Sequence, residues 1–259
     1  MTKFLKILDN PKFIYENIKK NLYNEHAKIC LDMLVDNGAF LAGGFSELIA
    51  ATAIYPVNFY DYLTVFNGDI DFWFETEEKF KSTSDAIIKF LIENNAEVEG
   101  VETDYTISIT FKTIFNEKIK FQIVKASLHP EELVSRFDME NARCFITHEG
   151  LFVTENYLEL LKKQQIKITV FEGFVCSIKR IAKWFSKKKY YRSIDDETKD
   201  TLILMLNEKI KNMLISSTMF NIIAFFLRHF PLLTFAFFTM FNEEKSTKDL
   251  SEFSHKTNY

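Results

Sequence analysis

A glycine turn at residues 43–44 and a pair of acidic side chains at residues 69 and 71 stand in the first third of the chain. A short apolar run, Phe40–Ala42, ends at two adjacent glycines, Gly43 and Gly44. Further on, Asp69 and Asp71 stand one residue apart in an otherwise aromatic and aliphatic run. Side chains alternate between the two faces of a β-strand, so both carboxylates are expected on one face. The pattern predicts a strand that breaks at a glycine turn, followed by a strand that presents two carboxylates.

Such a carboxylate pair has a chemical consequence. Two neighbouring carboxylates repel each other unless a cation or a proton lies between them. Hard oxygen ligands suit Mg²⁺ or Mn²⁺, and Mg²⁺ is commonly bound by one or two carboxylates together with substrate phosphates. We therefore expect Asp69 and Asp71 to be metal ligands.

Composition and charge limit the class of protein. The chain has 259 residues, of which 47% are hydrophobic and 26% charged, as in a globular protein with one large domain or two modest ones. Only 7 Gly and 4 Pro accompany 28 Phe and 10 Tyr, which favours long helices over many tight turns. A net charge of −4 argues against bulk nonspecific binding of nucleic acid, although it leaves room for a local basic patch.

The cysteines and the N-terminus indicate an intracellular, cytoplasmic protein. Cys30, Cys144 and Cys176 are widely spaced and odd in number, so they predict neither a disulfide framework nor a metal site. The N-terminal residues contain no long apolar segment and no small-residue cleavage site, so no secretory signal is predicted.

The hydrophobic pattern changes from mixed to helical near residue 156. Before it, periodicity and turn residues predict strands at 39–42, 69–74, 105–111, 118–124, 142–147 and 151–154, with helices at 11–37, 46–64, 77–92 and 131–137. After it, helices are predicted at 156–165, 171–188, 196–214 and 216–240. The expected fold is α/β, a mixed sheet with flanking helices over 1–155, then an all-helical domain over 156–241 and a flexible tail over 242–259.

These features, in this order, resemble the nucleotidyltransferase superfamily, whose fold is shared by polymerase-beta-like enzymes and poly(A) polymerases. Its members carry a Gly-Gly or Gly-Ser turn after the first strand, Asp-x-Asp on the second, a third carboxylate on a later strand and often a helical domain. Gly43-Gly44 and Asp69-Ile70-Asp71 match the first two elements. The stretches 121–138 and 177–184 look similar to a variant group found in large DNA viruses and phages. The resemblance covers about residues 35–190.

The resemblance implies metal-dependent transfer of a nucleoside monophosphate from an NTP, with ATP as the first candidate. Asp69 and Asp71 would coordinate Mg²⁺ or Mn²⁺ between the triphosphate and the attacking hydroxyl. Gly43 and Gly44 would let backbone N–H groups approach the phosphates, and Ser46 would donate to a phosphate oxygen. The acceptor stays open among RNA, a protein side chain and a small molecule.

The third carboxylate of the superfamily is missing from its expected strand. Strand 118–124 carries Gln122, whose amide oxygen can bind a cation but cannot act as a base. Asp138, or Asp104, could substitute from a nearby element. Gln122 also favours the alternative that the chain is a catalytically inactive, nucleotidyltransferase-like binding or assembly protein that uses its aromatic C-terminal region as an interface.

A basic run follows in the predicted helix 171–188. Its members are Lys179, Arg180, Lys183, Lys187, Lys188, Lys189 and Arg192, with Trp184, Phe185, Tyr190 and Tyr191 among them. Lys179 and Lys183 are four residues apart and share one helix face. This face is either the wall of a cleft that binds a triphosphate or an RNA backbone, or a solvated helix face.

The segment 213–241 is apolar almost all round. A helix with this pattern is deeply buried, forms an interface with a partner, or lies in a membrane. A membrane-spanning helix needs about 20 apolar residues, whereas Arg228, His229 and Pro231 divide this run. A buried hairpin or a homo-oligomer interface is therefore favoured over membrane association.

Overall fold

The computed structural model describes residues 2–54, 68–115, 117–188 and 190–211. They belong to two compact units, residues 1–163 and 164–259. The sequence placed the boundary at 155/156, whereas the first unit also includes helix α7 (Glu155–Lys163). This helix buries Tyr157, Leu160 and Leu161 and packs on the last strand of the first unit, which explains why it stays with that unit.

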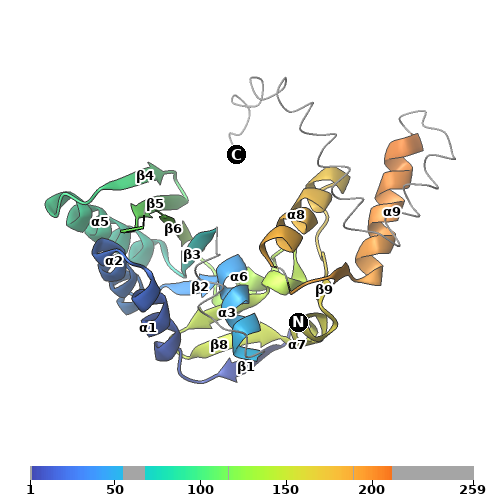
Figure 1. Ribbon diagram of the computed structural model, residues 1–259, viewed down its shortest axis with the longest axis horizontal. Coiled ribbons are helices and arrows are strands. Elements are labelled where there is room, and N and C mark those ends of the chain that lie inside the picture. The colour runs from blue at the N-terminus through green and yellow to red at the C-terminus, as the bar shows by residue number, and fades with distance from the viewer. Residues whose placement is uncertain (1, 55–67, 116, 189, 212–259) are drawn as a thin grey trace. The chain divides into compact units, whose positions relative to one another are not determined.

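The first unit is built on one eight-stranded mixed sheet (Figure 1). Its strands are β1 (Phe4–Leu8), β2 (Phe40–Ala42), β3 (Asp69–Phe74), β4 (Val98–Glu102), β5 (Thr106–Lys112), β6 (Lys118–Lys125), β7 (Cys144–Thr147) and β8 (Gly150–Thr154). Their order is β1-β8-β7-β2-β3-β6-β5-β4. Within this sheet β3 and β6 run parallel, and the other neighbours pair antiparallel. The predicted mixed sheet with flanking helices is confirmed for the first unit.

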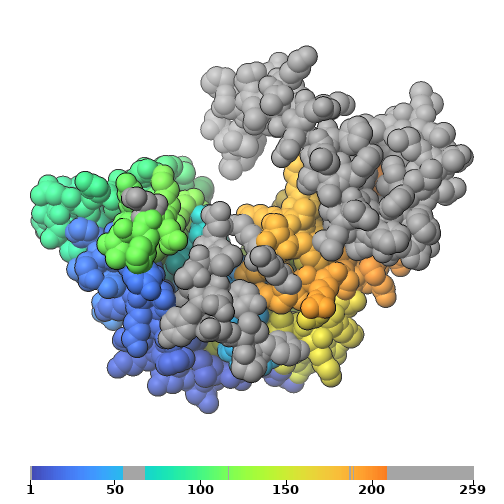
Figure 2. Space-filling view, viewed as in Figure 1, coloured from blue at the N-terminus to red at the C-terminus, as the bar shows by residue number. Residues whose placement is uncertain are grey.

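Helices flank the sheet. They are α1 (Lys12–Asn21), α2 (Glu25–Asp36), α3 (Gly44–Ile54), α5 (Glu77–Glu93), α6 (Pro130–Ser135) and α7, with a 3-10 turn η1 (Glu140–Ala142). Helix α5 packs on β3 and β6, and it also contacts α2. Figure 2 shows the surfaces of α2 and α5, in blue and green, meeting along one edge of the first unit.

The core is rich in phenylalanine because one face of the central strands is aromatic. Phe72 contacts Phe121 edge to face with ring centroids 5.1 Å apart, and Phe121 contacts Phe111 in the same way at 5.1 Å. All three side chains are fully buried, and burial of each contributes roughly 1.5–3 kcal/mol. A second cluster comprises Phe40, Ala42, Leu133, Val134 and Phe145, with Trp73 packed against it. Apolar packing therefore holds β3 from both faces, through Phe72 on one side and Trp73 on the other.

Three predictions in this unit need correction. The predicted helix 11–37 is two helices, because Tyr23 adopts a φ of +45° and the Asn24 side chain accepts a hydrogen bond from the Ala27 N–H to start α2. Strand β1 was also missed; it pairs antiparallel with β8, a strand distant in sequence. Strand β4 was missed because its sequence, with a central Gly100, is mostly exposed and held by backbone pairing to β5.

The described part of the second unit contains a pair of strands as well as helices. It consists of β9 (Gln165–Ile166), α8 (Phe174–Lys187), β10 (Ser193–Ile194) and α9 (Asp196–Lys211). Because β9 and β10 pair in parallel, the prediction of an all-helical domain is wrong for this part. The end of the predicted helix 46–64 (residues 55–64), the apolar segment 213–241 and the tail 242–259 lie outside the described residues. Within the described ranges, no helix has the length and apolar character needed to cross a membrane.

Candidate nucleotide and metal site

The glycine turn lies directly beside one of the two aspartates. Gly43 follows β2 with a φ of +94°, a conformation that favours glycine, and α3 begins at Gly44. A Cβ atom at position 43 would lie 3.1 Å from Asp71 Oδ2, whereas a Cβ at position 44 would meet no atom within 4 Å. The turn and the β3 carboxylate, far apart in sequence, are therefore neighbours in space.

Strand β3 presents its two carboxylates on one face, as alternation requires. Asp69 and Asp71 are half-buried, while the intervening Ile70 and the following Phe72 are buried on the opposite face. The apolar side chains anchor the strand in the core, so the carboxylates project from a rigid element. This placement is the one that the alternating pattern predicts.

Strand β6 supplies the neighbours of this carboxylate pair. In the parallel register Lys120 pairs with Asp69 and Gln122 pairs with Asp71. Lys120 Nζ lies 3.4 Å from Asp69 Oδ2. Gln122 therefore stands beside Asp71, on the strand where a third carboxylate was expected. Sequence reasoning missed Lys120 because the pairing partner of a strand residue is set by the sheet register.

The donor set fits a hard divalent cation. Two carboxylates on one face, with the Gln122 amide beside them, offer the oxygen ligands that Mg²⁺ or Mn²⁺ prefers. Among the described residues, however, no group of three or more Asp, Glu, His and Cys side chains is placed to hold a metal ion. Asp138, after α6, and Asp104, before β5, therefore do not complete a three-carboxylate cluster with the pair. The remaining ligands would come from substrate phosphates, as is common for Mg²⁺.

Ser46 is buried, and its contact with a phosphate stays a prediction. Its side chain is fully buried in the first turns of α3, and its hydroxyl has no hydrogen-bond partner among the described residues. In this arrangement the hydroxyl offers no exposed surface to a phosphate. The adjacent glycines, which expose backbone, are better placed for such a contact.

A buried glutamate in the first turn of α3 contacts a tyrosine of α7. Glu47 is fully buried, and its backbone N–H donates to the Gly43 carbonyl at 3.0 Å. The Tyr157 hydroxyl lies 3.3 Å from the Glu47 carbonyl oxygen and 3.5 Å from Glu47 Oε1. Tyr157 on α7, the last helix of the unit in sequence, thus contacts the first turn of α3, which follows the glycine turn. A glutamate near the start of a helix is usually exposed, so no sequence signal identified Glu47.

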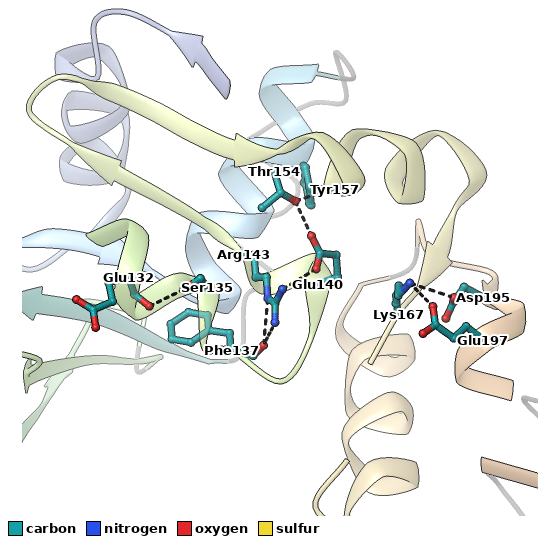
Figure 3. A network of polar contacts seen from close by, with 10 residues as sticks. All are labelled: Glu132, Ser135, Phe137, Glu140, Arg143, Thr154, Tyr157, Lys167, Asp195 and Glu197. Atoms are coloured by element: carbon teal, nitrogen blue, oxygen red, sulfur yellow. Dashed lines mark hydrogen bonds and ion pairs between the residues drawn. The ribbon is translucent and has the colours of Figure 1, made fainter. Parts of the chain in front are cut away.

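A second buried carboxylate holds α7 in place (Figure 3). The carboxylate of Glu140 accepts a hydrogen bond from Thr154 Oγ1 at 2.7 Å and pairs with Arg143 Nη1 at 3.0 Å. Thr154 Oγ1 in turn accepts from the Tyr157 N–H at 3.0 Å. Arg143 also donates to the Phe137 carbonyl from Nε and Nη2. Because its charge is paired and its oxygens are hydrogen-bonded, Glu140 can be buried at an acceptable cost.

The basic residues of α8 lie in the second unit. Lys179, Arg180 and Lys183 are exposed, while Ile178 and Ile181 are buried on the other side of the helix. Lys179 and Lys183 thus share an exposed face, and their contact with a nucleotide stays a prediction.

Lys188 differs from the other lysines of this run. Only 3% of Lys188 is exposed, and its ammonium lies 5.7 Å from the centre of the Trp184 ring. Tyr191 contacts the same ring with centroids 5.9 Å apart. Lys188 and Trp184 therefore contribute to packing at the end of α8.

Comparison with known proteins gives a likeness of fold. No protein-family model matches the chain, and no curated protein matches it. Among solved structures, a CCA-adding enzyme in apo form I matches with 16% identity and a TM-score of 0.51, covering 79% of this chain and 46% of that chain. A Thermotoga maritima CCA-adding enzyme complexed with tRNA matches with 17% identity and a TM-score of 0.47, covering 80% of this chain and 47% of that chain.

The chain thus spans about half the length of these structures. CCA-adding enzymes are polymerase-beta-like nucleotidyltransferases. The fold of this chain is similar to that of the first of these structures, which agrees with the α/β fold expected from the sequence. The likeness to a viral or phage variant group stays a prediction.

Proposed function

We propose that the protein is a metal-dependent nucleotidyltransferase that uses an NTP, with ATP as the first candidate. An acceptor hydroxyl would attack the α-phosphorus and lose its proton to solvent, the bond from that phosphorus to the α,β-bridging oxygen would break, and pyrophosphate would leave. The observation that carries the proposal is the contact between the glycine turn and the carboxylate strand, since a Cβ at Gly43 would lie 3.1 Å from Asp71 Oδ2. Phosphates approaching the turn would therefore also approach the carboxylates.

Each part of the site has a separate task in this proposal. Asp69 and Asp71 would hold Mg²⁺ or Mn²⁺, which when bound stabilises charge on the attacking and leaving oxygens. Gly44 begins a helix of 11 residues, whose N-terminal backbone N–H groups and dipole favour a bound phosphate. The open space at Gly44 would let a phosphate approach the backbone. Lys179 and Lys183 on α8 are proposed to contact the triphosphate or an RNA acceptor.

The test is a titration of Mn²⁺ with each NTP, followed by a transfer assay with RNA and protein acceptors. Asp69→Asn and Asp71→Asn should each abolish Mn²⁺-dependent NTP binding and lower transfer by at least about 100-fold, as expected when an electrostatic group is removed from a transition state. Asp85→Asn is the matched control, because Asp85 is an exposed carboxylate on α5. Equal binding by all three variants and the wild type would rule the proposed site out.

One observation favours a second candidate, a catalytically inactive binding or assembly protein. Gln122 is in register with Asp71, so the neighbouring strand brings an amide instead of a charged ligand. This candidate predicts Mn²⁺-dependent NTP binding that the aspartate variants abolish, without transfer to any acceptor. Gln122→Glu then provides a direct check. The added carboxylate should raise Mn²⁺ affinity and produce transfer to an acceptor.

A further inference from the structure

Lys120 is a positively charged side chain that pairs with Asp69, one of the two candidate metal ligands. It lies opposite Asp69 in the parallel β3–β6 register, and its Nζ is 3.4 Å from Asp69 Oδ2. The side chains are 38% and 42% exposed. An ion pair this exposed contributes little to folding stability. The fold therefore has little need of a lysine at this position, so a role in ligand binding is a better explanation for it.

The two carboxylates face different neighbours. Asp71 Oδ2 is close to the glycine turn, as the 3.1 Å distance to a Cβ at Gly43 shows, whereas Asp69 Oδ2 faces the Lys120 ammonium. Lys120 offsets one of the two negative charges of the pair, and the neighbouring Gln122 adds none. The local charge that a triphosphate meets is therefore less repulsive than that of a bare carboxylate pair.

We propose that Lys120 is a phosphate-binding residue of this site, held at Asp69 until a metal-bound nucleotide arrives. Its ammonium would pair with Asp69 in the nucleotide-free protein and would contact a phosphate oxygen once Asp69 binds the metal. A lysine suits this exchange, since its charge is compact and its four-carbon stem is flexible. This inference rests on the proposed function, and it adds a nucleotide contact from β6 that the sequence motifs do not mark.

The proposal predicts opposite effects of one substitution. In Lys120→Gln the cation that competes for Asp69 is gone, so Mn²⁺ should bind the nucleotide-free protein more tightly. The ammonium that would bind a phosphate oxygen is gone as well, so the Mn²⁺-bound protein should bind nucleotide more weakly. Each change should be about two- to fivefold, the range of exposed charge pairs. A lysine with a purely structural role would not move the two affinities in opposite directions.

The experiment measures Mn²⁺ binding by electron paramagnetic resonance and binding of a non-hydrolysable ATP analogue by fluorescence anisotropy. It compares wild type, Lys120→Gln, Lys120→Arg and Lys118→Gln. Lys118 is the matched control, because it lies on the same strand and pairs with the exposed Glu99 at 3.0 Å. Lys120→Arg keeps the charge and should retain most of the nucleotide affinity. Thermal melting of each variant establishes that it is folded.

The outcomes separate the inference from the function on which it rests. A wild-type protein that binds neither Mn²⁺ nor the analogue would overturn the proposed function itself. Wild-type binding with Lys120→Gln indistinguishable from Lys118→Gln would overturn only the role of Lys120. A fall in both affinities for folded Lys120→Gln would also overturn it, since the lysine would then support the site without competing for Asp69.

Discussion

At the scale of single residues, the candidate site depends on glycines at positions 43 and 44 as much as on the two aspartates. Gly43 adopts a φ of +94° and leaves room for the Asp71 carboxylate, while Gly44 has open space around it. The two glycines are adjacent in sequence and look equivalent there. The structure gives them different tasks, since the first permits the turn and the second exposes backbone.

Substitution of each glycine by alanine should therefore have a different result. Gly43→Ala should lower the free energy of unfolding by about 1–3 kcal/mol, because alanine is strained at this φ and its Cβ would press on Asp71. Gly44→Ala should leave stability within about 1 kcal/mol of wild type, since a helical alanine is favourable. If phosphates approach this backbone, Gly44→Ala should still weaken nucleotide binding. Urea denaturation and nucleotide titration measure the two effects, and equal losses of stability would contradict the assignment.

The sequence predicted those features of single residues that follow from the periodicity of one segment, and it missed those that depend on contacts between distant segments. The common face of Asp69 and Asp71 follows from strand alternation within one segment. Lys120 and Glu47 were missed, because their importance comes from a neighbouring strand and from Tyr157, distant in sequence. Burial likewise removes Ser46 from the exposed surface, although its position after the glycines suggested a phosphate contact.

At the scale of elements, regular patterns were predicted well and weakly patterned ones were not. The alternating segments 105–111 and 118–124 are strands β5 and β6, as predicted, and the structure pairs them antiparallel. Strand β4 has little apolar character and depends on backbone pairing with β5, so hydrophobic periodicity could not reveal it. The division of α1 from α2 depends on the backbone of Tyr23, which no propensity marks as a break.

Helix α5 provides a pH test of how one element is held to the sheet. Glu77, in its first turn, pairs with Lys125 on β6 at 2.7 Å and with Lys81 at 3.0 Å. The hydrogen bond from Lys125 and then that from Lys81 lower the pKa of Glu77 below its ordinary 4.5. A pKa lowered on folding contributes stability that is present above the unfolded value and is lost as pH falls through the folded value.

Glu77→Gln should therefore destabilise the protein slightly at about pH 7 and lose less further stability than wild type on going to about pH 3.5. The effect will be small, because the carboxylate is exposed and the ion pairs are solvated. Glu78→Gln is the control, since Glu78 shares the first turn of α5 but forms no ion pair with any described residue. Urea midpoints at the two pH values measure the difference. Parallel pH profiles for wild type and Glu77→Gln would show that the Lys125 pair does not link α5 to β6 energetically.

At the scale of the whole molecule, the charge balance limits how an RNA acceptor could bind. The chain carries a net charge of −4, so attraction to a polyanion must come from a local group of basic residues. Helix α8 exposes Lys179, Arg180 and Lys183 on the side opposite its buried isoleucines. An amphipathic helix with this pattern presents positive charge in one direction.

A charge-matched pair of double variants tests this surface. Lys179→Gln with Lys183→Gln and, as control, Lys162→Gln with Lys163→Gln each change the net charge from −4 to −6, since two positive charges are removed. Lys162 and Lys163 are exposed at the end of α7, so any difference between the double variants reports location. The α8 variant should bind single-stranded RNA more weakly, and the slope of log affinity against log salt should fall by about 0.7 for each phosphate that the protein no longer neutralises. Equal affinities and equal slopes for the two variants would identify the α8 lysines as a solvated helix face.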